Sequence, residues 1–189
     1  MASSSDGGVE TDEAWMGQFL KGDGQAFDVL FTRYAKVLHA YLARLVGPTA
    51  AEDVTQITFL SIVKSRGRFQ SGARVRPWLY AIATNAARDF LRRRRPEDLT
   101  PEGELPQTAA EGPSPRDWGL ERRVHHALAQ LPEAHREAII LHRFEGMSFA
   151  EIAQTLDVSE SAVKVRAYRG YQRLRELLRD LKPEGGTRA

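Results

Sequence analysis

The chain has 189 residues, 42% of them hydrophobic and 28% charged, and this composition excludes a chain that is disordered throughout. It contains no cysteine, which excludes a disulfide framework, a thiolate zinc site, an iron–sulfur cluster and a cysteine nucleophile. No apolar stretch reaches the about 18 to 20 residues that span a bilayer, and the first residues lack the basic and apolar regions of a signal peptide. We therefore expect a cytoplasmic protein without direct membrane insertion.

The formal net charge of +2 is unevenly distributed along the chain. Residues 1–95 carry 14 Lys/Arg against 9 Asp/Glu, residues 96–120 carry 1 against 6, and residues 121–189 carry 12 against 10. Such a pattern indicates two segments that can face a polyanion, separated by one that repels it.

Apolar residues recur at helical spacing on both sides of the acidic segment, which predicts an all-α protein of two small helical domains joined by an extended linker. The predicted organisation is a disordered N-terminus at 1–11, a first domain at 12–95, an acidic proline-rich linker at 96–120, a second domain at 121–182 and a disordered tail at 183–189.

The first domain is predicted to contain four helices. A short one spans about 12–21, and a long amphipathic one carries apolar residues from 27 to 46 and stops at Gly47-Pro48. Thr49 and Glu52 have capping-box spacing for the third helix. The fourth begins near Pro77, because proline suits the first turn of a helix.

The outer face of the Pro77 helix is small, polar and basic, as close approach to DNA requires. The alternative is that its terminal arginines only complement the negative end of the helix dipole. This outer strip consists of Ala81, Thr84, Asn85, Arg88, Arg92 and Arg95.

The second domain ends in a helix-turn-helix pattern. Ser148 and Glu151 form a second predicted capping box, and a tight turn at 157–159 places Ser159 at the start of the last helix. A basic second helix of this kind enters the major groove of DNA, whereas the alternative is a solvated face on an ordinary helical hairpin. Its exposed strip is predicted to hold Lys164, Val165, Tyr168, Arg169 and Gln172, with Arg166 and Arg173 beside it for phosphates.

Two stretches in order resemble the extracytoplasmic-function (ECF) family of sigma factors in the sigma-70 superfamily. AEDVTQITFLSIVKSRGRF followed by RPWLYAIATNAARDFLRRRRP is similar to the second conserved region of these proteins. LPEAHREAIILHRFEGMSFAEIAQTLDVSESAVKVRAYRGYQRLRELL is similar to their fourth. The resemblance implies a subunit that binds the clamp and flap regions of core RNA polymerase, directs it to promoter DNA and is held inactive by an anti-sigma factor, which can sequester it at the membrane.

The resemblance assigns roles to residues of the first domain. Asn85 falls at the position that reads the minus-ten element, and a flipped base must be held by a pocket and by hydrogen bonds to its edge. Arg88 and Arg92 suit backbone phosphates, and Trp78 suits packing. The loop that would capture the base consists of Gln70, Ser71, Gly72, Ala73, Arg74 and Val75. The surface that would dock on polymerase consists of Asp53, Gln56 and an exposed Phe59.

In the second domain, the resemblance assigns minus-35 contacts to the exposed strip of the last helix. Val165 stands where a small polar residue is common in the family, and Tyr171 where an arginine is common. The minus-35 set consists of Lys164, Val165, Arg166, Tyr168, Arg169 and Arg173.

No nucleotide-binding glycine motif, catalytic triad or metal-ligand spacing is readable, so we expect no cofactor, no small-molecule substrate and no catalytic activity. The histidines are expected to be solvated or to cap helices; they are His39, His125, His126, His135 and His142.

Three alternatives compete with a sigma factor. A sigma-factor mimic that titrates an anti-sigma factor would have no need of the two basic strips, and a stand-alone helix-turn-helix regulator would have no use for the first domain. A nucleic-acid enzyme would need a metal site or a cluster of catalytic carboxylates, which the sequence does not contain.

Overall fold

The computed structural model describes residues 11–70, 72–94 and 119–179, and all the regular elements in these ranges are helical. The all-α prediction is confirmed. Thr11, predicted to be disordered, caps the first helix; the rest of the predicted disordered ends and nearly all of the predicted linker lie outside the described residues. The helices are α1 (Asp12–Leu20), α2 (Gly24–Val46), α3 (Pro48–Ser65), the 3-10 turn η1 (Arg66–Arg68), α4 (Val75–Arg94), α5 (Leu120–Ala129), α6 (Glu133–Arg143), α7 (Phe149–Leu156) and α8 (Glu160–Leu177).

Helices α1 to α4 form the first unit. Helix α2 stops where predicted, because Gly47 adopts a positive φ of 89° that other residues rarely reach, and Pro48 then occupies the first turn of α3. The predicted capping box of Thr49 and Glu52 is wrong, since the helix begins before Thr49 and its N-cap makes no side-chain hydrogen bond. Helix α4 begins at Val75, two residues earlier than predicted.

Helices α5 to α8 form the second unit, in which the local predictions are confirmed. Ser148 and Glu151 make both bonds of the capping box, and these bonds hold the pKa of Glu151 below its usual value. Asp157 ends α7 in the left-handed conformation at φ 53°, and the side chain of Ser159 caps α8. The buried core of this unit includes Leu128, Ile139, Ile140, Leu141, Met147, Ile152 and Val163.

The crossing of α6 and α8 depends on Gly170. A Cβ at this position would lie 2.7 Å from Ile139 Cδ1 and 3.3 Å from His135 Cβ. We expect Gly170→Val to reduce the free energy of unfolding by about 1 to 3 kcal/mol through overpacking, measured by thermal denaturation. Gly17→Val in α1 is the matched control, because apart from its chain neighbours and its own helix backbone no heavy atom lies within 4 Å of a Cβ there. Equal effects of the two substitutions would contradict this packing account.

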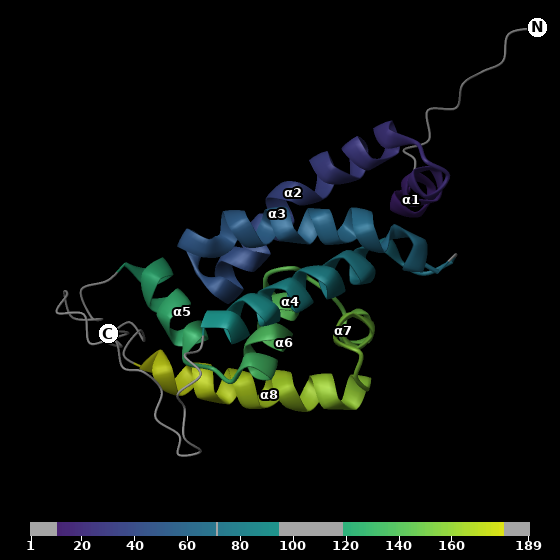
Figure 1. Cartoon of the computed structure of the whole chain (residues 1–189). Helices are drawn as coiled ribbons and strands as arrows, with labels where there is room; N and C mark the ends of the chain where they lie inside the picture. The colour runs from purple at the N-terminus through teal and green to yellow at the C-terminus, as the bar shows by residue number, and fades with distance from the viewer. Residues whose placement is uncertain (1–10, 71, 95–118, 180–189) are drawn as a thin grey trace, which may run out of the picture.

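The two units pack against each other. Helix α4 of the first unit lies against α7, and α2 lies against α5 and α6 (Figure 1). The imidazole of His125 on α5 is 3.1 Å from the carbonyl oxygen of Ala43 on α2. Among the described helices, none is long and apolar enough to cross a membrane.

Candidate nucleic-acid interface

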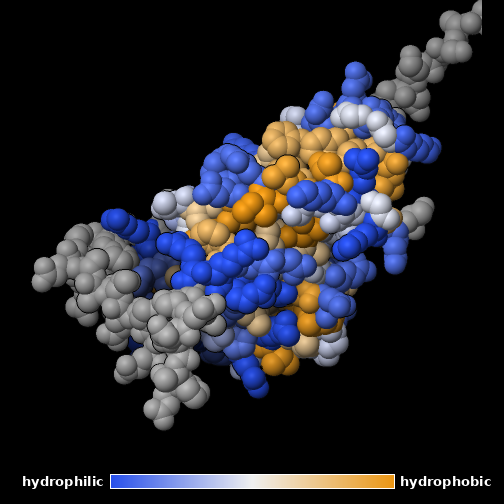
Figure 2. Space-filling model, viewed as in Figure 1, coloured by the Kyte–Doolittle hydropathy of each residue, from blue (hydrophilic) through white to orange (hydrophobic). Residues whose placement is uncertain are grey.

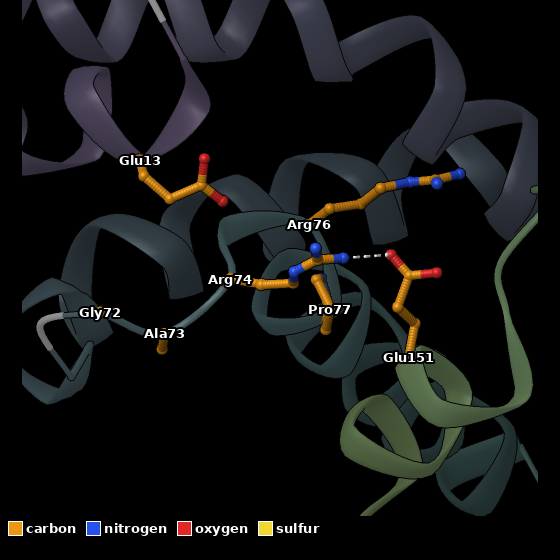
Figure 3. Close-up of a pocket in the computed structure, with 7 residues that line it drawn as sticks. All are labelled: Glu13, Gly72, Ala73, Arg74, Arg76, Pro77 and Glu151. Carbon is orange, nitrogen blue, oxygen red and sulfur yellow. Dashed lines mark hydrogen bonds and ion pairs between the residues drawn. The ribbon is translucent and has the colours of Figure 1, made fainter.

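The loop that precedes α4 borders an open pocket of about 440 Å³. Glu13 of α1 forms one side, Arg74 and Arg76 come from the loop and the start of α4, and Glu151 of α7 stands opposite (Figure 3). Arg74 Nη1 is 3.2 Å from Glu151 Oε1. A pocket lined by these charged groups therefore lies beside the loop to which the resemblance assigns the flipped base.

The loop residues are not equally available to a base. Gln70 and Gly72 are exposed and Ala73 is partly exposed, whereas Ser71 lies outside the described residues. Val75 is fully buried, and its backbone N–H donates to Glu13 Oε1 at 3.2 Å. The prediction for Val75 is therefore corrected: it is the first core residue of α4, so its side chain is not presented to a ligand.

Helix α4 exposes part of the predicted strip. Asn85 is exposed, and Arg92 is exposed and pairs with Asp89 at 2.8 Å. Thr84 is buried instead, because its hydroxyl lies 2.7 Å from the Tyr41 hydroxyl and donates to the carbonyl oxygen of Tyr80. Thr84 and Asn85 are adjacent in the sequence, but of these two side chains only the amide of Asn85 is exposed.

Arg88 makes contacts that the sequence did not predict. Its Nε and Nη2 donate to the two carboxylate oxygens of Glu137 on α6 at 2.7 and 2.6 Å, and Glu133 lies 3.5 Å from its Nε. These hydrogen bonds to Glu137 raise the pKa of Arg88 above its usual value. The guanidinium predicted to bind a promoter phosphate is therefore occupied by a carboxylate of the second unit.

Helix α8 presents the predicted minus-35 residues on its surface. Val165 is 48% exposed and Tyr168 is 66% exposed, which are large exposed fractions for side chains that are mainly hydrophobic. Lys164 pairs with Glu160 at 2.7 Å and Arg173 with Glu176 at 2.9 Å, so both are held by neighbours on the same helix. Tyr171 packs partly buried against the core, which explains an aromatic residue at that position.

One residue beside this strip was missed by sequence reasoning. His135 of α6 joins Arg166 and Arg169 in lining a shallow cleft of about 480 Å³ next to the start of α8. Burial, followed by the charges of Arg169 and Arg166, lowers the pKa of His135 from its usual value. Its place on a different helix gave no signal in the spacing of α8. In the described ranges, no group of three His, Cys, Asp or Glu side chains could hold a metal ion.

The surface predicted to dock on polymerase is partly corrected. Asp53 and Gln56 are exposed on α3, but Phe59 is only 7% exposed, because its ring packs 4.6 Å from that of Phe31. The apolar side chain presented next to it is Leu60, which is 60% exposed. Figure 2 shows hydrophobic surface gathered over the part of the molecule formed by α2 and α3. The large hydrophobic side chains exposed on these two helices are Phe31, Val37, Ile57 and Leu60.

Comparisons with known proteins match both units in order. The family model "Sigma-70 region 2" matches residues 30–97, and "Sigma-70, region 4" matches residues 121–174. RNA polymerase sigma factor CarQ of Myxococcus xanthus is 46% identical over 171 residues, which cover 89% of this chain and 98% of that protein. The chain belongs to the sigma-70 family of RNA polymerase sigma factors. The ECF RNA polymerase sigma factor SigM of Mycobacterium tuberculosis is 34% identical over 170 residues, 89% of this sigma factor and 85% of SigM.

The arrangement of this ECF sigma factor is also similar to a solved structure, that of CnrH in complex with the cytosolic domain of CnrY. The TM-score is 0.71 at 31% identity, over 92% of this chain and 100% of CnrH. The similarity extends over both units, so their relative placement resembles that of CnrH in this complex.

Proposed function

We propose that this sigma factor binds core RNA polymerase and directs it to promoters through two separate DNA contacts. The observation that carries the proposal is the ordered match of regions 2 and 4 to two helical units that each carry a helix with basic residues on one face. Asn85 and the Gln70–Arg74 loop would read and hold the minus-ten element, while Arg169 and its neighbours on α8 would read the minus-35 element. The chain acts by binding and has no catalytic step of its own.

The exposed apolar surface of α2 and α3 supports the polymerase part of the proposal. Leu60 lies beside the exposed Asp53 and Gln56 on α3, which gives an apolar centre with a polar surround, as in a protein interface. Mixing the chain with purified core polymerase and following the complex by size-exclusion chromatography tests this. The expected result is a complex that Leu60→Asp weakens, and no complex with the unaltered chain would contradict the proposal.

An anti-sigma factor is the proposed inhibitor. Support comes from the similarity to the sigma factor RpoE of Bartonella quintana, whose structure was solved in complex with the anti-sigma factor NepR and matches at 26% identity with a TM-score of 0.64. A cytoplasmic location, with sequestration at the inner face of the membrane by this partner, stays a prediction.

The cleft beside α8 makes minus-35 binding dependent on pH. His135 is mainly uncharged at about pH 7.5, because its pKa is lowered from the ordinary value. A DNA phosphate in the cleft would raise that pKa, so binding would take up a proton and strengthen as the pH falls. We expect the affinity to rise by up to about tenfold for each unit by which DNA raises the pKa.

Binding of a minus-35 duplex at about pH 7.5 and about pH 6, at one salt concentration, measures this effect. His135→Gln keeps a polar side chain and should remove the additional affinity at the lower pH. An unchanged pH dependence in this variant would show that His135 does not face the phosphate.

A further inference from the structure

Part of the basic face of the first unit is covered by acidic groups of the second, while Arg92 near the end of α4 stays exposed. Three carboxylates make these contacts, and each meets a group on or next to α4. Glu137 binds Arg88 through two hydrogen bonds, Glu145 Oε2 accepts a 2.6 Å hydrogen bond from the Tyr80 hydroxyl, and Glu151 pairs with Arg74.

Glu145 binds the first unit at several points. Its backbone carbonyl accepts a hydrogen bond from Arg76, and its carboxylate lies 3.7 Å from Arg44 Nη1. The guanidinium of Arg44 also stands 4.6 Å over the ring of Phe144. The turn after α6 is therefore fixed to both α2 and α4.

Glu137 is the most deeply buried of the three carboxylates, with a side chain that is 1% exposed. A charged carboxylate at such a position needs a close cation, because burial without one costs several kcal/mol. Arg88 supplies that cation from the other unit. The pairing is therefore part of what makes the closed arrangement stable.

We propose that the second unit is an internal competitor of promoter DNA, in which Glu137, Glu145 and Glu151 occupy the basic α4 face that minus-ten DNA takes when the units separate. This inference rests on the proposed function, since it concerns the same DNA-binding face. Arg88 uses the Nε and Nη2 edge of its guanidinium for Glu137, so a phosphate that binds on this edge has to displace the carboxylate. Closure and phosphate binding on this edge of Arg88 exclude each other.

The competition lowers the DNA affinity of the isolated chain. If only a fraction of the molecules has the two units separated, the apparent affinity for DNA at this face is reduced in proportion to that fraction. Glu151 adds a second barrier, since its ion pair with Arg74 lies across the pocket beside the base-binding loop (Figure 3). Any partner that separates the units, such as core polymerase, would expose this face and the pocket together.

The test measures closure and DNA binding on the same full-length molecules. Because the chain has no cysteine, Lys36→Cys on α2 and Arg175→Cys on α8 allow a fluorophore pair to report the separation of the units. Glu137→Gln is expected to lower energy transfer and to raise the affinity for a single-stranded minus-ten oligonucleotide by about fivefold or more. Asp28→Asn, which removes an exposed carboxylate of α2, is the control and should change neither.

If Glu137→Gln perturbs folding, exchanging the charges of Glu137 and Arg88 provides a second test. Glu137→Arg should open the chain, and adding Arg88→Glu should restore high energy transfer while leaving DNA binding weak. Equal energy transfer and equal DNA affinity in the unaltered chain, Glu137→Gln and Glu137→Arg would overturn the inference. If the oligonucleotide binds none of these variants even with core polymerase present, it is the proposed function that fails.

Discussion

Replacing Asn85 with alanine is expected to reduce formation of open promoter complexes by about 10- to 100-fold, the loss of one well-placed base contact. The amide is exposed on α4, next to the buried Thr84, so its removal takes away a hydrogen-bonding group without disturbing the core. Permanganate footprinting of the melted region, with polymerase reconstituted from core and variant, measures the effect.

Measuring the binding of Asn85→Ala to core polymerase distinguishes a role of Asn85 in reading DNA from a role in holding the fold. The complex of Asn85→Ala with core polymerase should be as stable as that of the unaltered chain, because the amide lies on α4 and not on the apolar surface of α2 and α3. Gln25→Ala, which removes an exposed amide at the start of α2, should affect neither property. Parallel loss of core binding and opening would mean that Asn85 does not read the minus-ten element.

Arg169→Ala is expected to weaken binding of the preferred minus-35 duplex by about 1 to 3 kcal/mol and to relax preference at one base position. Arg169 lies on α8 beside Val165, where a guanidinium can form two bonds with a guanine. Competition binding against duplexes with single base changes measures both the affinity and the preference.

Arg175→Ala is the matched control, since it removes an exposed arginine from another face of the same helix. It should produce only a small loss that is equal for all duplexes, through weaker electrostatic attraction. If Arg169→Ala lowers binding equally for every sequence, Arg169 contacts phosphate and does not read a base.

Much of each separate unit was predictable from the sequence. Helical spacing, Gly47-Pro48 and the Ser148/Glu151 capping box predicted where helices begin and end, because these signals act within a few residues. One local signal failed, since Thr49 and Glu52 do not cap α3. The other errors occurred where tertiary packing decides the outcome. Helical spacing alone predicts that Thr84 and Phe59 are exposed, but hydrogen bonding to Tyr41 buries Thr84 and packing on Phe31 buries Phe59.

The contacts between the units were not predictable. Arg88 and Glu137 are separated by 49 positions in the sequence, and nothing in the sequence near either residue indicates that the two side chains pair. Only the three-dimensional arrangement shows that Arg88 faces a buried carboxylate. For the same reason, His135 gave no sign in the sequence that it lies beside Arg166 and Arg169.

The most direct test of the account is transcription by purified bacterial core polymerase with this protein on a pooled genomic template, followed by sequencing of the transcript 5′ ends. A promoter-selecting sigma factor should give defined start sites that share two upstream elements and that disappear when the protein is omitted. Binding to core without any defined start sites would instead favour a sigma-factor mimic, and failure to bind core would contradict a sigma-factor function.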